Sequence, residues 1–542
     1  LWALFRLGEQ PKLAFFSLLL SIVPLAQVLV GQIIFPGDGW VAGLYLAGFG
    51  LTVLAGARLN SGKPNLHGSA TQLAPLFAGL VVAGVVSVGL ATHQWLNLQL
   101  SGLFTLDLEA GGRPYANMAQ PNQLATLLLM GLVGSAYLYE CRIVRGATAL
   151  IAAVVLAFGL ALTESRTALI AICVIWLAFL TMRRRANLRL TPLALLIPSC
   201  TFLLVTWFWS SINSFLLLSP GISLAERMGQ NLRLTIWSAL LDAVWRSPWF
   251  GYGWNQIPVA QQATALDHAA TRYLFDSSHN LFLDLALWNG LPIALLVAAG
   301  LAIWFWKRIA ECRDPSSWCL LLVVSLVFCH AMVEYPLAYA YFLLPVGFIM
   351  GALDRTTSSD GAHEGAKVRL PSVILLGAGL TALTISTMVV AEYLPLESQW
   401  REIRFEQARI GNAQMSPAPN TRVLTQLREH AKFRQTPVTS QMTQEQLDWM
   451  GQVAQRFGWA GNLFKYAQAL AINGRPGEAS IVLAKLCKIQ SPLLCRRAVE
   501  EWRLLASGKF PEMEKVALPL LPDLPGQGGR IEAPPLHGSP AP

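Results

Sequence analysis

Residues 271–292 read TRYLFDSSHNLFLDLALWNGLP, and the fold class can be argued outward from this stretch. Its polar first part ends in DSSHN at 276–280, and its second part is apolar except for Asp284 and Asn289. An apolar run of this kind is typical of a helix that enters a lipid bilayer. We therefore expect His279 at a boundary between water and membrane, at the start of a helix.

Histidine is the side chain whose charge changes near neutral pH, so His279 held at a helix start could act as a base. The simpler interpretation is an interfacial histidine that only forms hydrogen bonds, and position alone does not decide between the two. Asp276, Ser277 or Ser278 could cap the helix by accepting hydrogen bonds from its first free N–H groups.

The composition of the whole chain indicates a membrane protein. Of 542 residues, 54% are hydrophobic and 13% are charged, whereas soluble domains carry roughly 25% charged residues. The chain begins at Leu1, so we expect residues upstream, and its first apolar run is too long for a cleavable signal peptide. The eight cysteines show no closely spaced metal-binding pairs, and the sequence has no Gly-rich phosphate loop and no HExxH motif.

Eleven apolar runs are candidates for membrane spans, because about 20 apolar residues cross a bilayer. They lie near 12–35, 40–57, 71–92, 122–139, 147–163, 167–182, 190–210, 281–306, 317–333, 337–353 and 370–391. The runs at 167–182 and 317–333 are short for a span. The sequence thus predicts an all-α, polytopic membrane bundle of about eleven spans over residues 1–391.

Lysine and arginine gather in alternate loops, which sets the expected orientation because short cytoplasmic loops are basic. The basic loops carry Arg58 and Lys63; Arg142 and Arg145; Arg183, Arg184, Arg185 and Arg189; Lys307, Arg308 and Arg313; and Arg355, Lys367 and Arg369. The loops at 36–39 and 334–336 carry neither residue type. The amino end is then cytoplasmic, and His279 and the carboxyl domain lie outside, in the periplasm of a Gram-negative cell.

Two long loops of the predicted outer face, 93–121 and 211–280, carry arginines against this rule. The arginines of the outer face are Arg113, Arg166, Arg227, Arg233, Arg246 and Arg272. Guanidinium binds phosphate oxygens through two parallel hydrogen bonds, and an arginine at membrane depth usually has a partner or a function. The simpler interpretation pairs each with a local acid, as Arg166 could pair with Glu164. As a set on the face of His279, they indicate an anion site.

Further polar residues are predicted at this face. The segment 113–123 carries the amides Asn117, Gln120, Asn122 and Gln123. These amides could bind a sugar or phosphate, or could simply cap a helix and form turns. Glu334 and Tyr335 lie in a tight turn between two spans, where a tyrosine anchor is common and a glutamate is less expected.

The composition changes after about residue 392. Residues 392–517 are predicted to form a helical domain, with short helices near 441–456, 462–472 and 478–487. The last two have the helix–turn–helix form of a tetratricopeptide unit. The tail at 518–542 is rich in proline and glycine and is expected to be disordered.

Cys487 and Cys495 are the two cysteines of this carboxyl domain, which the predicted topology places in an oxidising compartment. They flank residues 489–492, a break between two helices. We predict a Cys487–Cys495 disulfide, with two buried free thiols as the alternative.

With these residues in place, the chain resembles the bacterial lipid-linked glycan ligases, which include O-antigen ligases, O-antigen polymerases and PglL-type protein O-oligosaccharyltransferases. Their shared signature is His-Asn-x9-Gly at the start of a late span, here His279-Asn280 followed by Gly290. A Ser-Arg-Thr turn matches residues 165–167, and Arg-x3-Trp matches Arg233 to Trp237.

Within that group the chain is most similar to the PglL type. The features that carry this likeness are QPN at 120–122, EYPL at 334–337 and GRPGEA at 474–479. Such proteins usually have one or two further spans at the amino end, so the chain is expected to be truncated there.

The resemblance implies a donor glycan on polyprenyl pyrophosphate and, for the PglL type, a Ser or Thr acceptor in a secreted protein such as a pilin. It implies that His279 lies near the acceptor hydroxyl and that Arg166 and Arg233 bind the pyrophosphate, with Arg113 as a third candidate. The residues expected in support are Gln120, Asn122, Asn280, Glu334 and Tyr335. Neither a metal nor a cofactor is expected, and the location is the bacterial inner membrane.

Other functions remain open from the sequence. An O-antigen ligase or polymerase would use a sugar hydroxyl as acceptor. A transporter or flippase would show internal repeats with charged residues facing each other in mid-membrane, and neither is seen. A non-enzymatic membrane scaffold leaves the outer arginines around His279 without a reason.

Overall fold

The computed structural model describes residues 12–59, 72–98, 108, 112–218, 232–356, 372–407 and 419–521. Within these residues all regular elements are helices. They are α2 (Lys12–Leu20), α3 (Val23–Leu29), α4 (Pro36–Leu59), α6 (Ala74–Trp95), α7 (Pro121–Glu140), α8 (Gly146–Leu162), α9 (Arg166–Met182), α10 (Pro192–Trp207), α11 (Trp209–Phe215), α13 (Leu232–Arg246), α14 (Ile257–Thr264), α15 (Leu281–Glu311), α16 (Pro315–Ala331), η1 (Pro336–Ala338), α17 (Ala340–Thr356), α18 (Ser372–Gln407), α19 (Thr425–Gln435), α20 (Gln444–Arg456), α21 (Ala460–Ile472), α22 (Pro476–Ile489), α23 (Pro492–Ser507) and η2 (Pro511–Lys515). The predicted all-α class is confirmed.

Each of the eleven apolar runs coincides with one or two of these helices where the structure describes it. By length and composition, four of the described stretches could cross a membrane: 12–29, 36–57, α6 and α15. The pair α10 and α11, bent by 62°, would make a fifth, and α8, α9, α16 and α17 are shorter apolar helices. The fold is therefore a bundle of apolar helices of the kind that membrane proteins form.

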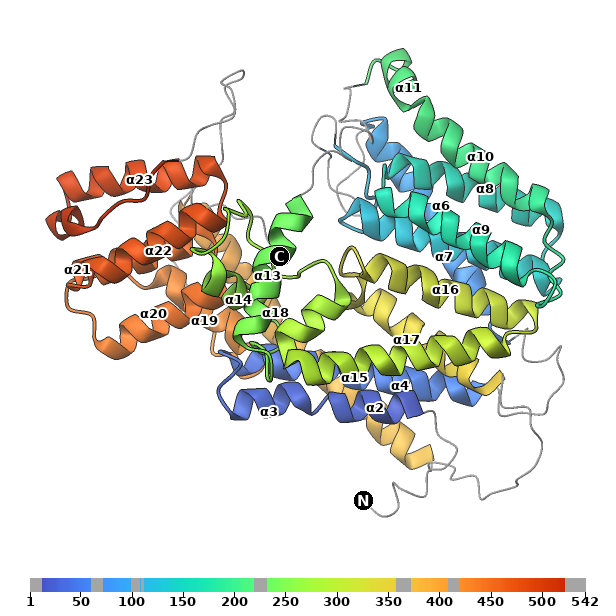
Figure 1. Ribbon diagram of the computed structural model, residues 1–542, viewed down its shortest axis with the longest axis horizontal. Coiled ribbons are helices and arrows are strands. Elements are labelled where there is room, and N and C mark those ends of the chain that lie inside the picture. The colour runs from blue at the N-terminus through green and yellow to red at the C-terminus, as the bar shows by residue number, and fades with distance from the viewer. Residues whose placement is uncertain are drawn as a thin grey trace.

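Small residues let these helices pack closely. A Cβ on Gly351 of α17 would lie 1.9 Å from the carbonyl oxygen of Val53, and one on Gly56 of α4 would lie 1.9 Å from that of Phe348. The backbones of α4 and α17 are thus in direct contact, which is how helices associate where lipid removes the hydrophobic drive. On the other side, α16 packs against both α17 and α7, and α7 packs against α6 and α8 (Figure 1).

Helix α15 is broken at Gly290, the glycine of the His-Asn-x9-Gly motif, where φ is 77° and ψ is 171°. The turn before α14 fills the break. Tyr252 N donates to Leu287 O at 2.6 Å and Gly253 N donates to Trp288 O at 3.1 Å. In a continuous helix Leu291 N–H would bond the first of these carbonyls, and the second would have no helical donor because Pro292 lacks an N–H. The inserted turn satisfies both groups.

Leu291 N in turn donates to Pro248 O at 2.7 Å. The break separates a first part of α15 at 281–289 from a second part at 291–311, which at 1.5 Å per residue is roughly 30 Å long and could cross a bilayer alone. The predicted run at 281–306 is therefore two helical pieces rather than one straight span.

The carboxyl-terminal helices α19–α23 lie together at one end of the molecule, with α13 and α14 between them and much of the apolar bundle (Figure 1). The predicted short helices correspond to α20, α21 and α22. Cys487 at the end of α22 and Cys495 at the start of α23 form a disulfide with a Cα–Cα distance of 4.7 Å, which is the pairing predicted from the sequence.

A buried ion pair connects the carboxyl-terminal helices to the apolar helices. The Arg456 guanidinium contacts Asp38 of α4 through two hydrogen bonds, Nε to Oδ2 at 2.7 Å and Nη2 to Oδ1 at 3.0 Å. Gln256 donates to the same carboxylate at 3.3 Å. The Arg456 Nη1 also lies 4.0 Å from Asp276 Oδ1, so the pair reaches the loop that carries His279.

Candidate functional site

His279 lies at the end of the loop before α15, in a backbone conformation that the surrounding residues hold in place. Its φ is +58°, a value that costs a non-glycine residue about 1 kcal/mol. Its side chain is 23% exposed, and its ring lies between those of Phe275 and Tyr335, with centroids 5.9 Å and 5.2 Å away. Such strain in a half-exposed ring is typical of functional positions.

The helix cap differs from the prediction. Asn280, rather than Asp276, Ser277 or Ser278, caps α15, since its Oδ1 accepts from Phe282 N and Leu283 N at 3.1 Å each. The amide of Asn280 then donates to Met332 O at 3.2 Å. One side chain therefore starts the helix and ties the His279 loop to the segment that follows α16.

That segment carries Glu334, whose side chain is 7% exposed and whose Oε2 lies 3.2 Å from Nδ1 of His279. The two atoms are close but do not form a hydrogen bond in this ring orientation. Contacts of this kind commonly tighten once substrate binds. A carboxylate at Nδ1 favours the tautomer with hydrogen on Nδ1, which leaves Nε2 free to accept a proton.

Asn122, at the start of α7, connects Glu334 to the rest of the site. Its Nδ2 donates to Glu334 Oε1 at 2.9 Å. Its Oδ1 accepts from Arg113 Nη2 at 3.1 Å and from Ser165 Oγ at 2.8 Å. Because two donors hold Oδ1, the amide orientation is fixed, and Asn122 presents its N–H to Glu334.

Arg113 has a second hydrogen bond, from Nε to Thr163 O at 2.8 Å. The Arg113 guanidinium therefore donates hydrogen bonds both to Asn122 and to the turn before α9. Ser165 and Arg166 follow in that turn, and Arg166 is the first residue of α9, half-buried. The sequence motifs at 113–122 and 165–167 thus meet in space through Asn122.

The Arg-x3-Trp motif also reaches the site. Trp237 of α13 donates from Nε1 to Ser278 O at 2.8 Å, directly before His279. Arg233 precedes it by one helical turn and lies on the same face of α13. The side chain of Arg233 and all of Arg227 lie outside the described residues.

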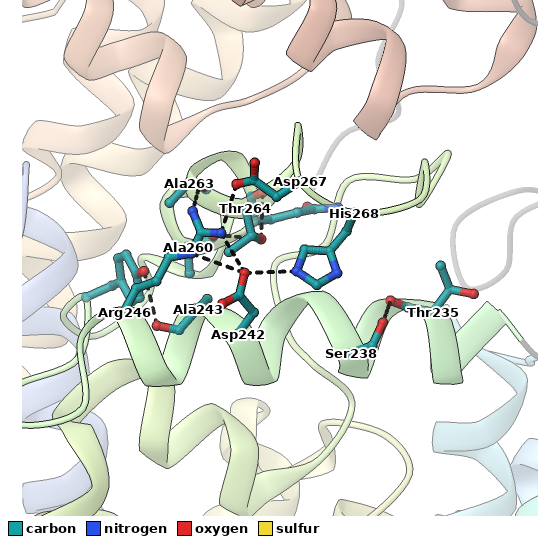
Figure 2. A network of polar contacts seen from close by, with 12 residues as sticks. Thr235, Ser238, Asp242, Ala243, Arg246, Ala260, Ala263, Thr264, Asp267 and His268 are labelled. Atoms are coloured by element: carbon teal, nitrogen blue, oxygen red, sulfur yellow. Dashed lines mark hydrogen bonds and ion pairs between the residues drawn. The ribbon is translucent and has the colours of Figure 1, made fainter.

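Two other outer arginines are not part of this arrangement, which corrects the expectation of one arginine set around His279. Figure 2 shows Arg246 between Asp242 and Asp267, with Nη2–Oδ2 distances of 2.6 Å and 2.8 Å, and His268 Nε2 at 2.9 Å from the same Asp242 oxygen. The Arg246 guanidinium holds the pKa of Asp242 below its usual range. Arg272 is exposed, and its backbone N–H donates to Lys488 O at 3.1 Å.

Gln120 and Gln123 lie one turn apart at the start of α7. Gln123 is fully buried, and neither of its amide atoms, nor the buried Oε1 of Gln120, has a hydrogen-bond partner among the described residues. Buried amides of this kind usually have a partner such as water or a ligand. Asn117 is exposed and accepts from Ser87 Oγ at 3.1 Å.

Tyr335 lies beside His279 and stacks on Tyr339 with centroids 5.9 Å apart. Burial, with the neighbouring Tyr339, raises the pKa of the Tyr335 phenol above its usual value. The hydroxyl therefore stays protonated at neutral pH and can donate a hydrogen bond. The site combines this donor with a base, Nε2 of His279, at the edge of an apolar bundle.

Sequence reasoning missed two residues that shape the site, Asp284 and Thr163. Asp284 interrupts the apolar run of residues 281–289, which was the available signal. Thr163 contributes its backbone carbonyl, for which the sequence gives no signal. In the part of the chain that the structure describes, no group of three His, Cys, Asp or Glu side chains could hold a metal ion.

Comparison with known proteins shows which families the residues of this site resemble. Residues 151–298, which contain Arg166, Arg233 and His279, match the family described as O-antigen ligase. Residues 114–139, which contain Gln120 and Asn122, match the family described as protein glycosylation ligase. Residues 318–489 match the C-terminal part of a virulence factor membrane-bound polymerase.

Two relatives from Acinetobacter baylyi make the likeness more specific. The chain is 29% identical to a general O-oligosaccharyltransferase over 498 residues, which cover 89% of this chain and 84% of the relative. It is 30% identical to a ComP-specific O-oligosaccharyltransferase over 350 residues, covering 63% and 61%. The resemblance to the O-antigen ligase group, and within it to the protein glycosylation ligases, is confirmed.

Proposed function

We propose that the protein is a glycosyltransferase that moves a glycan en bloc from polyprenyl pyrophosphate to a Ser or Thr hydroxyl of a secreted protein such as a pilin. The observation that carries this proposal is the contact chain from His279 through Glu334 and Asn122 to Arg113 and Ser165. This contact chain brings the proposed base, His279, close to the turn that carries Arg166, at the start of α9. Both relatives are named as O-oligosaccharyltransferases, which supports a protein acceptor.

In the proposed mechanism His279 serves the acceptor. Its Nε2 takes the hydroxyl proton while the hydroxyl oxygen bonds to the anomeric carbon. The bond from that carbon to the pyrophosphate oxygen breaks, and its electron pair leaves with the phosphate. A single displacement of this kind inverts the anomeric carbon. Glu334 holds the ring in the required tautomer and stabilises the imidazolium that forms.

The arginines serve the leaving group. Arg166 and Arg233 neutralise the charge that develops on the pyrophosphate, through paired N–H donors. Arg113 acts through Asn122, since two of its N–H groups already hold Asn122 and Thr163. Arg166→Ala and Arg233→Ala should weaken both donor binding and transfer, and Arg→Lys should rescue poorly because a point charge lacks the two-pronged geometry.

The donor's lipid implies a membrane location. We propose about eleven spans in the bacterial inner membrane, with the amino end cytoplasmic and His279 on the periplasmic face. The alternation of basic and non-basic loops supports this orientation. Alkaline phosphatase fused after residues 280 and 400 should be active at both sites. Activity of a cytoplasm-only reporter at either site would overturn the orientation.

A ligase that uses a sugar hydroxyl is the second candidate, favoured by the O-antigen ligase match at residues 151–298. One experiment separates the two. The protein is expressed in a host with a known lipid-linked glycan and a co-expressed pilin, and both intact pilin mass and lipopolysaccharide are analysed. A pilin heavier by one glycan, absent with His279→Ala, supports the protein transferase. Glycan found only on lipopolysaccharide would show the ligase instead.

A further inference from the structure

Asp284 is a carboxylate in the first part of α15, and its side chain is almost completely buried, at 3% exposed. A buried carboxylate is costly unless hydrogen bonds satisfy it. Here both oxygens are used within the loop that carries His279. Oδ2 accepts from Ser277 Oγ at 2.7 Å, and Oδ1 accepts from Ser278 N at 2.6 Å.

These two hydrogen bonds lead directly to His279. Ser277 Oγ, which donates to Asp284, also accepts from His279 N at 3.0 Å. A serine hydroxyl has one hydrogen to give and lone pairs to receive. Asp284 fixes the direction of that hydrogen, and this direction aims the lone pair of Ser277 at the His279 backbone.

The opposite side of the loop is held independently. Trp237 Nε1 donates to Ser278 O at 2.8 Å, and Asn280 Nδ2 donates to Met332 O at 3.2 Å. These contacts fix the residues on either side of His279. Asp284 adds a hydrogen-bonded link through Ser277 to the backbone N–H of His279. This link keeps the His279 backbone at φ +58°.

We propose that Asp284 is a positioning residue for the transfer reaction: through Ser277 and Ser278 it holds His279 in the left-handed conformation that aims the imidazole between Glu334 and the acceptor. The proposal rests on the proposed function, in which His279 is the base. Asp284 also interacts electrostatically with His279, so the test has to separate the effect of its charge from that of its hydrogen bonds.

Three variants separate position from charge. Asp284→Ala removes both attachments. Asp284→Asn removes the charge but can keep both, with its oxygen accepting from Ser278 N and its N–H₂ donating to Ser277 Oγ. Ser277→Ala removes the link to His279 and leaves the carboxylate bonded to Ser278 N. Asp354→Asn is the matched control, because Asp354 of α17 is a partly buried carboxylate that accepts from Trp304 Nε1, on the second part of α15, at 2.7 Å.

Transfer kinetics of the purified full chain should show a loss in kcat with an unchanged donor KM. We expect Asp284→Ala to lower kcat by about 100-fold, as displacement of a reacting group by about 1 Å does. Asp284→Asn and Ser277→Ala should each lose about tenfold. Asp354→Asn should keep the parental kcat. A kcat for Asp284→Ala within threefold of parental, or a rise in donor KM that matches the fall in kcat, would overturn the proposal.

A second measurement does not depend on activity. Diethyl pyrocarbonate modifies neutral imidazole, and its rate at His279 can be followed by peptide mass spectrometry against His268 as internal standard. Release of the loop in Asp284→Ala should raise the His279 rate several-fold and leave the His268 rate unchanged. An unchanged His279 rate in a folded variant refutes the positioning role. If the parental protein transfers no glycan while this rate still rises, the proposed function fails and the positioning role stands.

Discussion

The Nδ1 of His279 lies 3.2 Å from Oε2 of Glu334, although the two residues lie 55 positions apart, before α15 and after α16. The same carboxylate accepts from Asn122 Nδ2 at 2.9 Å. Glu334 therefore has the Asn122 amide at one oxygen and the His279 ring at the other. This pairing sets which imidazole nitrogen can act as a base, and it makes the first prediction specific.

Glu334→Gln should lower kcat for transfer by about 100-fold or more, with little change in donor affinity. A glutamine has only one accepting oxygen, and Asn122 cannot rotate its amide because Arg113 and Ser165 hold its oxygen. An N–H₂ group is then left facing Nδ1, which favours the tautomer with hydrogen on Nε2. Glu311→Gln, in an ion pair with Arg308 at the far end of α15 from His279, is the control. Equal kcat values in the two variants would contradict the tautomer argument.

Gly290→Ala should prevent the chain from folding stably. The added Cβ would lie 2.4 Å from both the carbonyl carbon and the oxygen of Trp249, at a φ of +77°. Backbone overlap at such a position costs about 3 kcal/mol or more. Gly300→Ala is the matched control on the same helix, because its Cβ would meet nothing within 4 Å. Thermal unfolding in detergent measures the stability of both variants. Equal Tm values would show that the close approach of the inserted turn does not require glycine at position 290.

Asp38→Asn should destabilise the protein by about 3–5 kcal/mol, because it leaves the buried Arg456 guanidinium without its charge partner. The double variant Asp38→Leu with Arg456→Met should lose less than Asp38→Asn, since it buries no unpaired charge. Chemical unfolding followed by tryptophan fluorescence gives both values. A double variant less stable than the single one would mean that the pair contributes more than it costs to bury.

His430 should make the carboxyl-terminal helices sensitive to acid. Burial, with the nearby Arg434 charge, lowers the pKa of His430 well below its usual value. The folded chain keeps the ring neutral while the unfolded chain binds a proton near pH 6.5. Stability is therefore fully present above about pH 6.5 and falls by roughly 1.4 kcal/mol per pH unit below it.

The measurement for His430 is the pH dependence of unfolding free energy between pH 7.5 and 5.5. His430→Gln keeps an oxygen that can accept from Asn462 Nδ2, which lies 3.0 Å from the histidine Nε2, and removes the titration. The parental curve should fall more steeply with acid than that of the variant. Parallel curves would show that the ring takes up its proton in the folded state.

The apolar runs predicted the helices because lipid-facing and buried helices share one compositional signal. The same signal placed His279 at a helix start, as the structure has it. It could not give the cap, because the Ser277 hydroxyl donates to Asp284 and the Ser278 hydroxyl donates to Asn280 O. Asn280 caps the helix instead. Nor could it give the Asn122–Glu334 hydrogen bond, which joins residues 212 positions apart and depends on how α7 packs against α16.

The arginines show the same limit. Arg246 follows Asp242 by four residues on α13, a spacing that predicts an ion pair. Its second partner, Asp267, lies beyond α14 and follows only from the fold. Arg113 is likewise taken up by Asn122 and by the carbonyl of Thr163. Charge placement alone therefore could not tell which arginines join the His279 site and which pair elsewhere.

The most direct test of the central claim is transfer from a purified polyprenyl-pyrophosphate glycan to an acceptor pilin, measured beside donor binding, with the parental protein and His279→Ala. We predict glycosylated pilin from the parental protein, with or without EDTA. We predict no product from a folded His279→Ala variant that still binds the donor with near-parental affinity. Transfer by His279→Ala at the parental rate, or loss of parental activity in EDTA, would contradict the account.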